Sequence, residues 1–466
     1  MDLRKPFFLV GIGGSGMMPL AMILAGQGAE VAGSDRSLDQ ARLPAKFDAL
    51  RALGINLFPQ DGSGITRADQ IVIASAAIEP TVADIVTAER VGAQRMSRAE
   101  LLSELFNAAP TSIGVAGTSG KSTVTGMIGW ILHDTDREPT VMNGAVMKNF
   151  ARPEAPFASA LVGEGQLFVS EVDESDGSIA LYNPTIAVLN NVSLDHKSLE
   201  ELRALFGGFA ARARIAIVNI GDAEAAALAA GLTGDVRTVA IDAPADYRAE
   251  NLAPERFAIS FDLVVRQARH RVRLAVPGRH NVANALTALA ACDAAGVPLP
   301  AAIEALGWFK GLKRRFDLVG VAGGVAVIDD FGHNPDKIAA TLDTLHEFPG
   351  RLLILFQPHG YGPLKVMRDD LVESIAARLA PGDVMVLPDP AYFGGTVSRE
   401  VTSADIVADL SARGADARHV PVRDDAAALL LSEARPGDRI VIMGARDDTL
   451  SQLAADMFAK LSSGAR

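Results

Sequence analysis

The stretch Gly114-Val-Ala-Gly-Thr-Ser-Gly-Lys-Ser-Thr123 stands where an apolar segment meets the start of a helical pattern. Its glycines allow a tight turn whose backbone N–H groups point at an anion. Lys121 adds a positive charge for phosphate, and Ser122 or Thr123 offers a hydroxyl to Mg²⁺. The loop is a shortened variant, because Val115 stands where the pattern G-x-x-x-x-G-K-[ST] expects its first glycine. We predict a nucleoside triphosphate site, against the alternative of a glycine-rich turn that binds nothing.

Length and composition indicate a globular protein of several domains. At 466 residues the chain is too long for one ordinary core, and about three domains are expected. The net charge of −12 argues against non-specific binding to nucleic acid or to an anionic membrane. Because the sequence has no apolar run of about 20 residues, we expect a cytoplasmic protein without membrane partners. We further expect a monomer or a homodimer. The single cysteine, Cys292, lies in an Ala-rich stretch and is predicted to be a buried, inert thiol.

Apolar runs alternate with Ala/Leu-rich helical patterns along the whole chain, which is typical of parallel sheets covered by helices. The segment Asn107–Ser112 is a candidate boundary between the first two blocks. The predicted strands are Phe7–Val10, Glu30–Gly33, Gln70–Ala74, the run before the phosphate loop, Leu167–Glu171, Thr185–Leu189, Ile215–Asn219, a β-rich patch over Phe257–Val276, Val325–Asp329, Arg351–Phe356, Asp383–Leu387 and Arg439–Met443.

A second glycine-rich loop, Gly11-Ile-Gly-Gly-Ser-Gly16, follows the first predicted strand and opens a helix. Asp35 ends the next strand, 19 residues past Gly16, which completes the fingerprint of a dinucleotide site. The physical requirement is only that a diphosphate can bind at this helix N-terminus, and the diphosphate of a UDP-sugar meets it equally well. The alternative is a turn needed only for close packing of strand and helix.

Acidic and imidazole side chains follow two strands of the central block. Glu171-Val-Asp-Glu-Ser-Asp176 places four carboxylates at a strand end, where they can hold Mg²⁺ directly or through water. Asn190-Asn-Val-Ser-Leu-Asp-His196 follows the next strand, and His196 is either a metal-linked residue or a hydrogen-bonded structural one. Without the phosphate loop, a solvated acidic turn would be the simpler interpretation of the first segment.

Two further clusters lie near the start of the third block. Asn281 and Asn284 stand one helical turn apart after Pro277-Gly-Arg-His, and their amides can contact a nucleobase edge or cap the helix. The basic triplet Lys313-Arg-Arg315 precedes Asp329-Asp-Phe-Gly-His-Asn-Pro335, which ends a strand. Such a triplet is either a solvated face or a group that reaches phosphate.

In this order, the motifs resemble those of the Mur ligases, the ATP-dependent amino-acid ligases of peptidoglycan synthesis, and most closely the alanine-adding branch. The similarity covers nearly the whole chain. The segments that carry it are Gly11–Met17, Ser75–Ile78, Gly117–Thr123, Glu171–Asp176, Asp195-His196, Pro277–Asn281, Lys313–Phe316, Asp329–His333 and Phe356–His359.

The resemblance implies an α/β fold of three domains. These are a Rossmann-like N-terminal domain for the UDP-sugar (1–108), a central ATP-binding domain with the phosphate loop (109–315) and a Rossmann-like C-terminal domain (316–466). It also implies ATP and Mg²⁺ as cofactors, with a UDP-sugar and an amino acid as substrates. By default these are UDP-N-acetylmuramate and L-alanine. The implied reaction activates a carboxylate as an acyl phosphate, which an amine attacks to form an amide.

The resemblance also assigns site residues. The implied catalytic residues are Lys121, Glu171, His196, Arg315 and His333, with Arg315 at the γ-phosphate. The implied ATP-binding residues are Gly117, Thr118, Ser119, Gly120, Lys121, Ser122, Thr123, Asn281, Asn284 and Asp330, the two asparagines at adenine. The implied metal-binding residues are Ser122, Glu171 and His196. The implied substrate-binding residues are Gly13, Gly14, Ser15, Gly16, Met17, Asp35, Ser75 and His359.

The chain departs from the family pattern at several places. Ser119 and Ser122 replace a usual His and Thr, and Lys197-Ser198 replace a usual Met-Asp. The third-domain loop reads His359-Gly-Tyr-Gly-Pro-Leu-Lys365 and lacks two arginines that are natural partners for the carboxylate of the incoming amino acid. Lys365 or Arg446 is a candidate replacement for that charge.

Three other functions compete with this interpretation. A paralogous ligase would join a different amine, such as a preformed peptide, and the altered third-domain loop favours it. A nicotinamide-dependent oxidoreductase would use the first glycine loop, but would leave the second loop and the acidic strand end unexplained. A catalytically silent binding protein would retain the fold, and the presence of Lys121, Glu171 and His196 argues against it.

Overall fold

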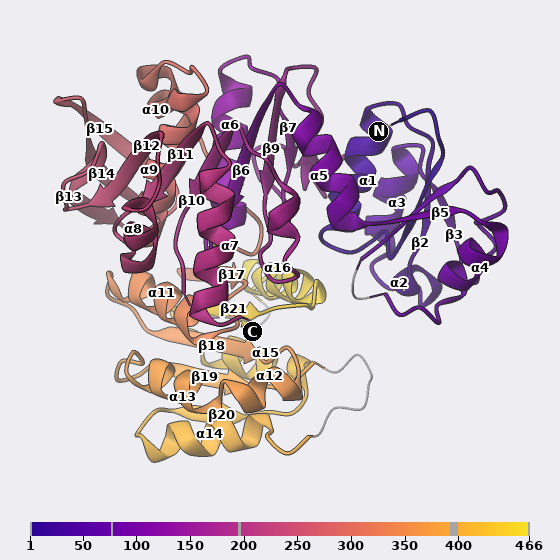
Figure 1. The fold of residues 1–466 in the computed structure, drawn as a ribbon. Helices are drawn as coiled ribbons and strands as arrows, with labels where there is room; N and C mark the ends of the chain where they lie inside the picture. Colours follow the sequence, from indigo (N-terminus) through magenta and orange to yellow (C-terminus); the bar gives the residue numbers. More distant parts are fainter. Residues whose placement is uncertain (1, 76–77, 194–196, 392–398, 465–466) are drawn as a thin grey trace. The chain divides into compact units, whose positions relative to one another are not determined.

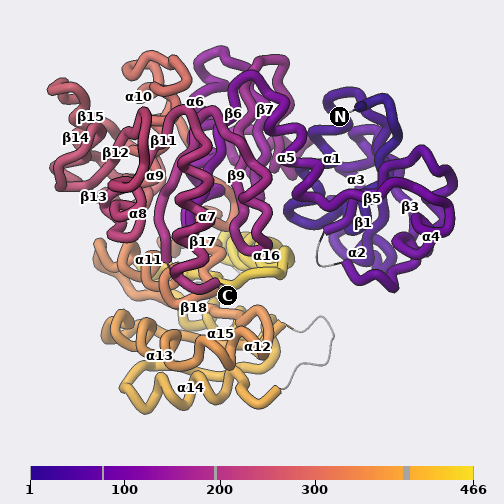
Figure 2. The backbone as a smooth tube through the Cα atoms, viewed as in Figure 1, coloured from indigo at the N-terminus to yellow at the C-terminus, as the bar shows by residue number. Residues whose placement is uncertain are grey.

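The computed structural model describes residues 2–75, 78–193, 197–391 and 399–464, and within them the strands form three sheets (Figure 1). The chain divides into two compact units. The first contains residues 1–253, 259–275 and 281–311, and the second contains residues 254–258, 276–280 and 312–466. Along the chain, the strands of the first sheet come first, those of the central sheet follow, and those of the third sheet come last (Figure 2).

The first sheet has five parallel strands in the order β3-β2-β1-β4-β5. All four residues of β1, Phe7–Val10, are buried, as expected for a parallel strand covered on both faces. Because β1 lies between β2 and β4, the order of the chain reverses at its carboxyl end, where ligands bind in such sheets. The other elements are β2 (Val31–Ser34), β3 (Asn56–Phe58), β4 (Ile71–Ala74), β5 (Gln94–Ser97), α1 (Met17–Gly26), α2 (Arg36–Asp39), α3 (Pro44–Ala52), α4 (Ala83–Val91) and α5 (Arg98–Ala108).

The central sheet has ten strands in the order β15-β14-β13-β12-β11-β10-β6-β9-β7-β8. The pairs β14·β15 and β7·β8 are antiparallel, whereas β6 is parallel to both of its neighbours. Its strands are β6 (Thr111–Ala116), β7 (Thr140–Met142), β8 (Ala160–Leu161), β9 (Leu167–Glu171), β10 (Ile186–Leu189), β11 (Ile215–Asn219), β12 (Asp235–Ile241), β13 (Tyr247–Glu255), β14 (Ala258–Val265) and β15 (Ala268–Leu274). The helices of this region are α6 (Lys121–Asp134), η1 (Ser178–Leu181), α7 (Leu199–Ala211), α8 (Ala223–Ala229), α9 (Arg279–Ala294) and α10 (Leu299–Gly307).

The third sheet has six strands in the order β16-β17-β21-β18-β19-β20, and β16 is antiparallel to β17. Successive residues of β18 enter two different cores: Leu352 and Ile354 pack with α11, α13 and α14, whereas Leu353 packs with α15 and α16. Both faces of this sheet are therefore covered by helices. The elements are β16 (Asp317–Ala322), β17 (Val325–Asp330), β18 (Leu352–Gln357), β19 (Val384–Leu387), β20 (Ala417–His419), β21 (Arg439–Gly444), α11 (Pro335–His346), α12 (Tyr361–Val366), α13 (Arg368–Ala376), α14 (Ser403–Ala412), α15 (Arg423–Glu433) and α16 (Thr449–Ser462).

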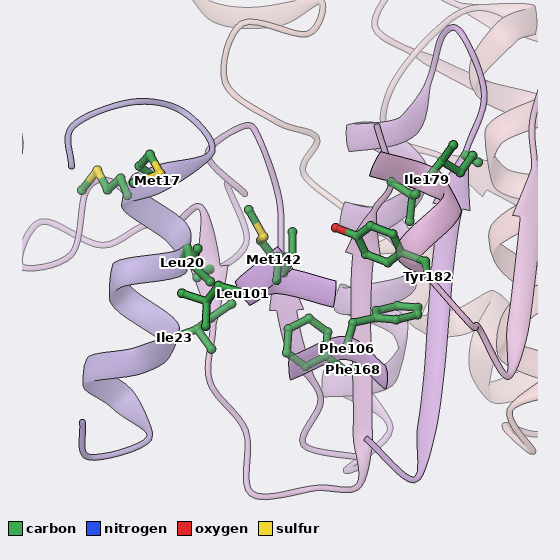
Figure 3. Packing of buried hydrophobic residues seen from close by; sticks show 14 of the residues in the cluster. Met17, Leu20, Ile23, Leu101, Phe106, Met142, Phe168, Ile179 and Tyr182 are labelled. Carbon is green, nitrogen blue, oxygen red and sulfur yellow. The ribbon is translucent and has the colours of Figure 1, made fainter. Parts of the chain in front are cut away.

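One continuous apolar core joins the first sheet to the central sheet. Leu20 and Ile23 of α1 are fully buried and share a cluster with Met142 of β7 and Phe106 of α5 (Figure 3). The ring of Phe106 meets that of Tyr182 edge-on at 5.2 Å. Each such fully buried apolar side chain contributes about 1.5–3 kcal/mol relative to an exposed one. This shared core explains why both sheets belong to a single compact unit.

The structure confirms the predicted α/β class, and β1, β9 and β11 have the predicted bounds. The patch expected over 257–276 belongs to a polar strand series that begins earlier, at β12 and β13. The candidate boundary at 107–112 contains the end of α5 and the start of β6, with only Ala109 and Pro110 between them. Cys292 is buried, and burial raises the pKa of its thiol. Among the described residues, none of the helices combines the length and apolar character that crossing a membrane requires.

Candidate active site

The phosphate loop leaves the carboxyl end of β6 and leads into α6. Two of its glycines have backbone angles that side chains disfavour, with φ of +140° at Gly117 and +84° at Gly120. A Cβ at Gly120 would lie 2.5 Å from Asn190 Nδ2 and 2.6 Å from Asn284 Oδ1, so packing also requires a glycine here. Thr123 lies in the first turn of α6. The loop is therefore held in a tight turn at a helix N-terminus, where anions bind.

Lys121 occupies the first turn of α6 and is largely buried. Its Nζ donates to Gly117 O at 2.7 Å and forms an ion pair with Glu174 Oε2 at 2.8 Å. Only 19% of the Lys121 side chain and 7% of the Glu174 side chain are exposed. The ammonium group is thus fixed against the loop by one carbonyl and one carboxylate.

The hydroxyl of Ser122 donates to Glu171 Oε2 at 2.8 Å. The pairing of β6 with β9 sets this contact, because Val115 lies opposite Glu171 in the register. Asn143 is fully buried and donates from Nδ2 to Ser122 O at 2.9 Å. A Cβ at Gly144 would lie 2.3 Å from Glu171 Oε1, so the glycine leaves room for the carboxylate.

A hydroxyl and a carboxylate in contact are the oxygen donors that Mg²⁺ prefers, so Ser122 and Glu171 fit the predicted metal. Burial raises the pKa of the nearby Asp173 carboxyl. The Ser175 hydrogen bonds and the charges of Lys121 and Arg98 together lower it by more, so the net shift of this pKa is downward. Among the described residues, no three His, Cys, Asp or Glu side chains gather as a metal cluster. His196, the third predicted ligand, lies outside the described residues.

A chain of side-chain amides supports the loop from beneath. Asn190, which follows β10, donates from Nδ2 to both Ser119 O at 3.0 Å and Asn284 Oδ1 at 2.9 Å. Asn284 Nδ2 donates in turn to Asn281 Oδ1 at 3.1 Å. All three asparagines are buried, and α9 begins at Arg279, so Asn281 lies inside the first turn instead of capping the helix.

Asn191 binds the other side of the loop. Its Oδ1 accepts the Ser119 N–H at 2.8 Å, and its Nδ2 donates to Ser119 O at 3.0 Å. The Thr118 hydroxyl accepts from the Ser193 N–H at 3.0 Å and donates to Ser193 O at 3.1 Å. The backbone of the phosphate loop is therefore fixed at two successive residues by the segment that follows β10.

The first glycine loop connects β1 to α1. The carboxylate of Asp35 accepts the Gly13 N–H at 2.8 Å with one oxygen and the Ser37 N–H at 2.7 Å with the other, which caps α2. Gly14 N–H donates to Gly11 O at 3.0 Å. Asp35 thus has a structural task, and its predicted contact with ribose stays a prediction.

Ser75 follows β4, and β4 is the neighbour of β1, so parallel pairing brings Ser75 to the same sheet edge as the first glycine loop. Met17 is buried in the first turn of α1.

In the second unit, Asp330 ends β17 and is buried. Its Oδ2 accepts the Phe316 N–H at 2.7 Å, and its Oδ1 accepts the Gly332 N–H at 2.8 Å and the Thr341 hydroxyl at 3.0 Å. The carboxylate therefore organises the loop between β17 and α11. The predicted contact of Asp330 with ATP is untested.

His333 and His359 lie side by side in the second unit, with ring centroids 5.1 Å apart. Burial, together with the positive charge of Lys337, lowers the pKa of His333 to about 3. His333 Nδ1 lies 2.8 Å from Phe331 O, and the Arg315 guanidinium stacks 4.2 Å from the centroid of the Phe331 ring. The imidazole is therefore neutral at physiological pH and can serve as a hydrogen-bonding group.

The middle residue of the basic triplet proves to be structural. Arg314 is buried, has a φ of +60°, and donates to Gly444 O at 2.6 Å and Asp447 O at 3.0 Å. Its Nε lies 3.5 Å from Asp329 Oδ1. Sequence reasoning missed this role, because both carbonyl partners lie more than a hundred residues away along the chain.

The two candidate replacements for the missing arginines differ in their surroundings. Lys365 is about half exposed and forms an ion pair with Glu400. Arg446 is exposed and has a φ of +58°. The neighbouring Asp447 is buried and bonded to Arg423 at 3.0 Å.

Three family models match successive parts of the chain, in the order in which the motifs occur. Family models match residues 7–109 (Mur ligase family, catalytic domain), 115–292 (Mur ligase middle domain) and 314–446 (Mur ligase, glutamate ligase domain). The UDP-N-acetylmuramate–L-alanine ligase of Streptomyces coelicolor is 37% identical, and the alignment covers 96% of each chain.

Solved structures of ligases also match this chain over nearly its whole length. The UDP-N-acetylmuramate–alanine ligase from Thermotoga maritima is 25% identical with a TM-score of 0.80, covering 99% of this chain and all of that one. A murein peptide ligase from Psychrobacter arcticus, 24% identical with a TM-score of 0.72, covers 98% of this chain and 99% of that one and shares the fold.

Proposed function

The chain belongs to the Mur ligase family of ATP-dependent ligases, and from this premise we propose that it joins L-alanine to the carboxylate of UDP-N-acetylmuramate in peptidoglycan synthesis. The observation that carries the proposal is the pair of contacts at the phosphate loop, Lys121 with Glu174 and Ser122 with Glu171. They bring a phosphate-binding cation and an oxygen-rich Mg²⁺ site to adjacent positions on one helix.

The chemistry needs both groups. A carboxylate resists attack by an amine until one of its oxygens becomes a good leaving group. In the proposed reaction a carboxylate oxygen attacks the γ-phosphorus of ATP and ADP departs. The amine of alanine then attacks the acyl carbon, phosphate leaves and the nitrogen loses a proton. Lys121 would neutralise charge on the phosphates, and Ser122 and Glu171 would hold Mg²⁺, which would supply further positive charge there.

The remaining assignments extend this proposal to the rest of the chain. Support for adenine recognition near Asn281 and Asn284 is their buried position beside the loop. We assign Arg315, His333 and His359 of the second unit to phosphate and substrate contacts. The stacked Arg315 and the neutral His333 suit hydrogen bonding to an anion.

The direct test is turnover with defined substrates. The purified protein is incubated with ATP, Mg²⁺, UDP-N-acetylmuramate and L-alanine, and ADP release and product mass are followed. We expect a product heavier than the UDP-sugar by one alanyl residue, no ADP release when the UDP-sugar is omitted, and no ADP release beyond about one equivalent per enzyme when alanine is omitted. ADP release that depends on neither substrate would contradict the proposal.

A second candidate keeps the reaction and changes the amine. The loop from His359 to Lys365 lacks the two arginines expected for an amino-acid carboxylate, and Lys365 is paired with Glu400. A panel of amines decides between the candidates, with L-alanine, other amino acids and a preformed peptide compared under equal conditions. Turnover with L-alanine at least tenfold above every other amine would exclude the peptide ligase, and the reverse order would establish it.

A further inference from the structure

We propose that Arg98 binds the diphosphate of the nucleotide-sugar substrate at the first glycine loop. The identity of that substrate rests on the proposed function. The contact itself is argued from the described residues of the first unit. Nothing in the sequence motifs singled out Arg98, because it begins a helix eighty residues after the loop.

The loop has fewer free donors than its glycines suggest. The N–H groups of Gly11 and Ile12 donate to Ser34 O, and that of Gly14 donates to Gly11 O. The Gly13 N–H is taken by the Asp35 carboxylate, which also places a negative charge behind the loop. Among the described residues only the N–H groups of Ser15 and Gly16 in this loop have no protein partner. Two amides beside a carboxylate are weak recognition for a diphosphate, so a cation is needed.

Arg98 supplies that cation at the same place. A Cβ built on Gly16 would lie 3.1 Å from both Cδ and Nη1 of Arg98, so the guanidinium lies beside Gly16, which carries one of the two open amides. Gly16 has ordinary backbone angles, with φ of −95°, so its lack of a side chain matters for this approach and not for the turn. The glycine is what lets the arginine reach the loop.

The position of Arg98 is unfavourable for stability alone. It is the first residue of α5, directly after the Ser97 cap, where the helix dipole disfavours a positive charge. Within the described residues Arg98 forms no hydrogen bond or ion pair that would offset this cost. By contrast Arg95, three residues earlier, is exposed and paired with Glu89. A partly buried, unpaired cation beside Gly16, at the loop that carries the two open amides, is suited to binding an anion.

The test is a binding titration that needs no turnover. Uridine, UDP and UDP-N-acetylmuramate are titrated into the wild type, Arg98→Ala, Arg98→Lys and the matched control Arg95→Ala, and ATP is titrated separately. We expect Arg98→Ala to weaken UDP and UDP-sugar binding about 10- to 100-fold, as for loss of a charge-assisted hydrogen bond. Uridine and ATP binding should stay within twofold of wild type, Arg98→Lys should recover part of the loss, and Arg95→Ala should bind as wild type does.

Three outcomes overturn the proposal: unchanged UDP binding in Arg98→Ala, equal losses for uridine and UDP, or an equal loss for ATP, which would indicate a merely structural role. A wild type that binds UDP and depends on Arg98, yet forms no amide with alanine, supports the Arg98 contact and refutes the proposed function. A wild type that binds no UDP refutes both.

Discussion

Lys121 Nζ lies 2.8 Å from Glu174 Oε2, so the lysine of the phosphate loop is paired with a carboxylate of the acidic strand-end segment. This contact joins the two motifs that the sequence separates by about fifty residues. It also holds the ammonium group against Gly117 O, where phosphate oxygens would approach the loop. Binding of a triphosphate must exchange at least part of the Glu174 contact for phosphate contacts.

Removing the charge of Lys121 should therefore be far more damaging than removing the charge of Glu174. Lys121→Ala should lower kcat/KM for ATP about 10³-fold, since a preorganised cation at developing phosphate charge contributes about 3–4 kcal/mol. Glu174→Gln should stay within about tenfold of wild type, because the lysine remains. ADP release under saturating UDP-sugar and L-alanine measures both, with the exposed Lys310→Ala as control. Unchanged turnover in Lys121→Ala would show that the site is misassigned.

Loss of the Glu171 carboxylate should appear as a changed demand for Mg²⁺. Glu171→Gln keeps the size and one oxygen of the side chain beside the Ser122 hydroxyl but removes the charge. We expect the Mg²⁺ concentration for half-maximal turnover to rise about tenfold or more, because hard cations prefer charged oxygen ligands. A Mg²⁺ titration of ADP release measures it, and Glu164→Gln, at an exposed position, is the control. An unshifted titration would exclude Glu171 as a metal-binding residue.

The buried parallel strands were predictable because each is a short, nearly continuous apolar run. β1, β9 and β11 are of this kind, and their bounds agree with the prediction. β15, with the sequence Ala-Arg-His-Arg-Val-Arg-Leu, lies at the edge of its sheet inside the β-rich patch expected over 257–276, and only Val272 and Leu274 of it are buried. The ends of such a polar edge strand depend on the strand and the face that it packs against, which its residue types alone do not specify.

The candidate site was predictable where the chemistry is local and unpredictable where it depends on distant partners. Lys121 and Ser122 stand within one motif, so their proximity follows from the helix. The Asn190–Asn284 hydrogen bond joins residues 94 positions apart, and only the arrangement of β10 and α9 brings them together. The role of Arg314 was unpredictable for the same reason. Its side chain donates to distant backbone carbonyls, which every residue type has, so no sequence pattern marks them.

The amide chain below the loop should contribute to both stability and ATP binding. Asn190→Ala removes two donated hydrogen bonds and leaves Ser119 O and Asn284 Oδ1 without that donor. We expect a loss of about 1–3 kcal/mol in unfolding free energy and a raised KM for ATP. Urea denaturation and initial rates measure the two effects, with Asn56→Ala at an exposed position of β3 as control. A variant with wild-type stability and KM would refute the supporting role.

Stability of the second unit should fall as pH rises from about 4 to 6 because of Asp329. Burial raises the pKa of this carboxyl to about 6, opposed by Arg314 and the Ser451 hydrogen bond and assisted by the charges of Asp317 and Asp330. In the unfolded chain the same group titrates near 3.8. Between these values the folded state holds a proton that the unfolded state has lost, so the slope of unfolding free energy against pH is negative.

A shift of this size corresponds to about 3 kcal/mol, lost progressively across that window and constant above it. Asp329→Asn removes the titration while keeping an acceptor for Ser451, so the difference between variant and wild type should grow from pH 4 to 6 and then level off. Urea denaturation at half-unit pH steps measures it, with the exposed Asp456→Asn as control. Because other groups contribute equally to both proteins, a difference that is flat with pH, or that shrinks as pH rises, would show that Asp329 ionises normally in the fold.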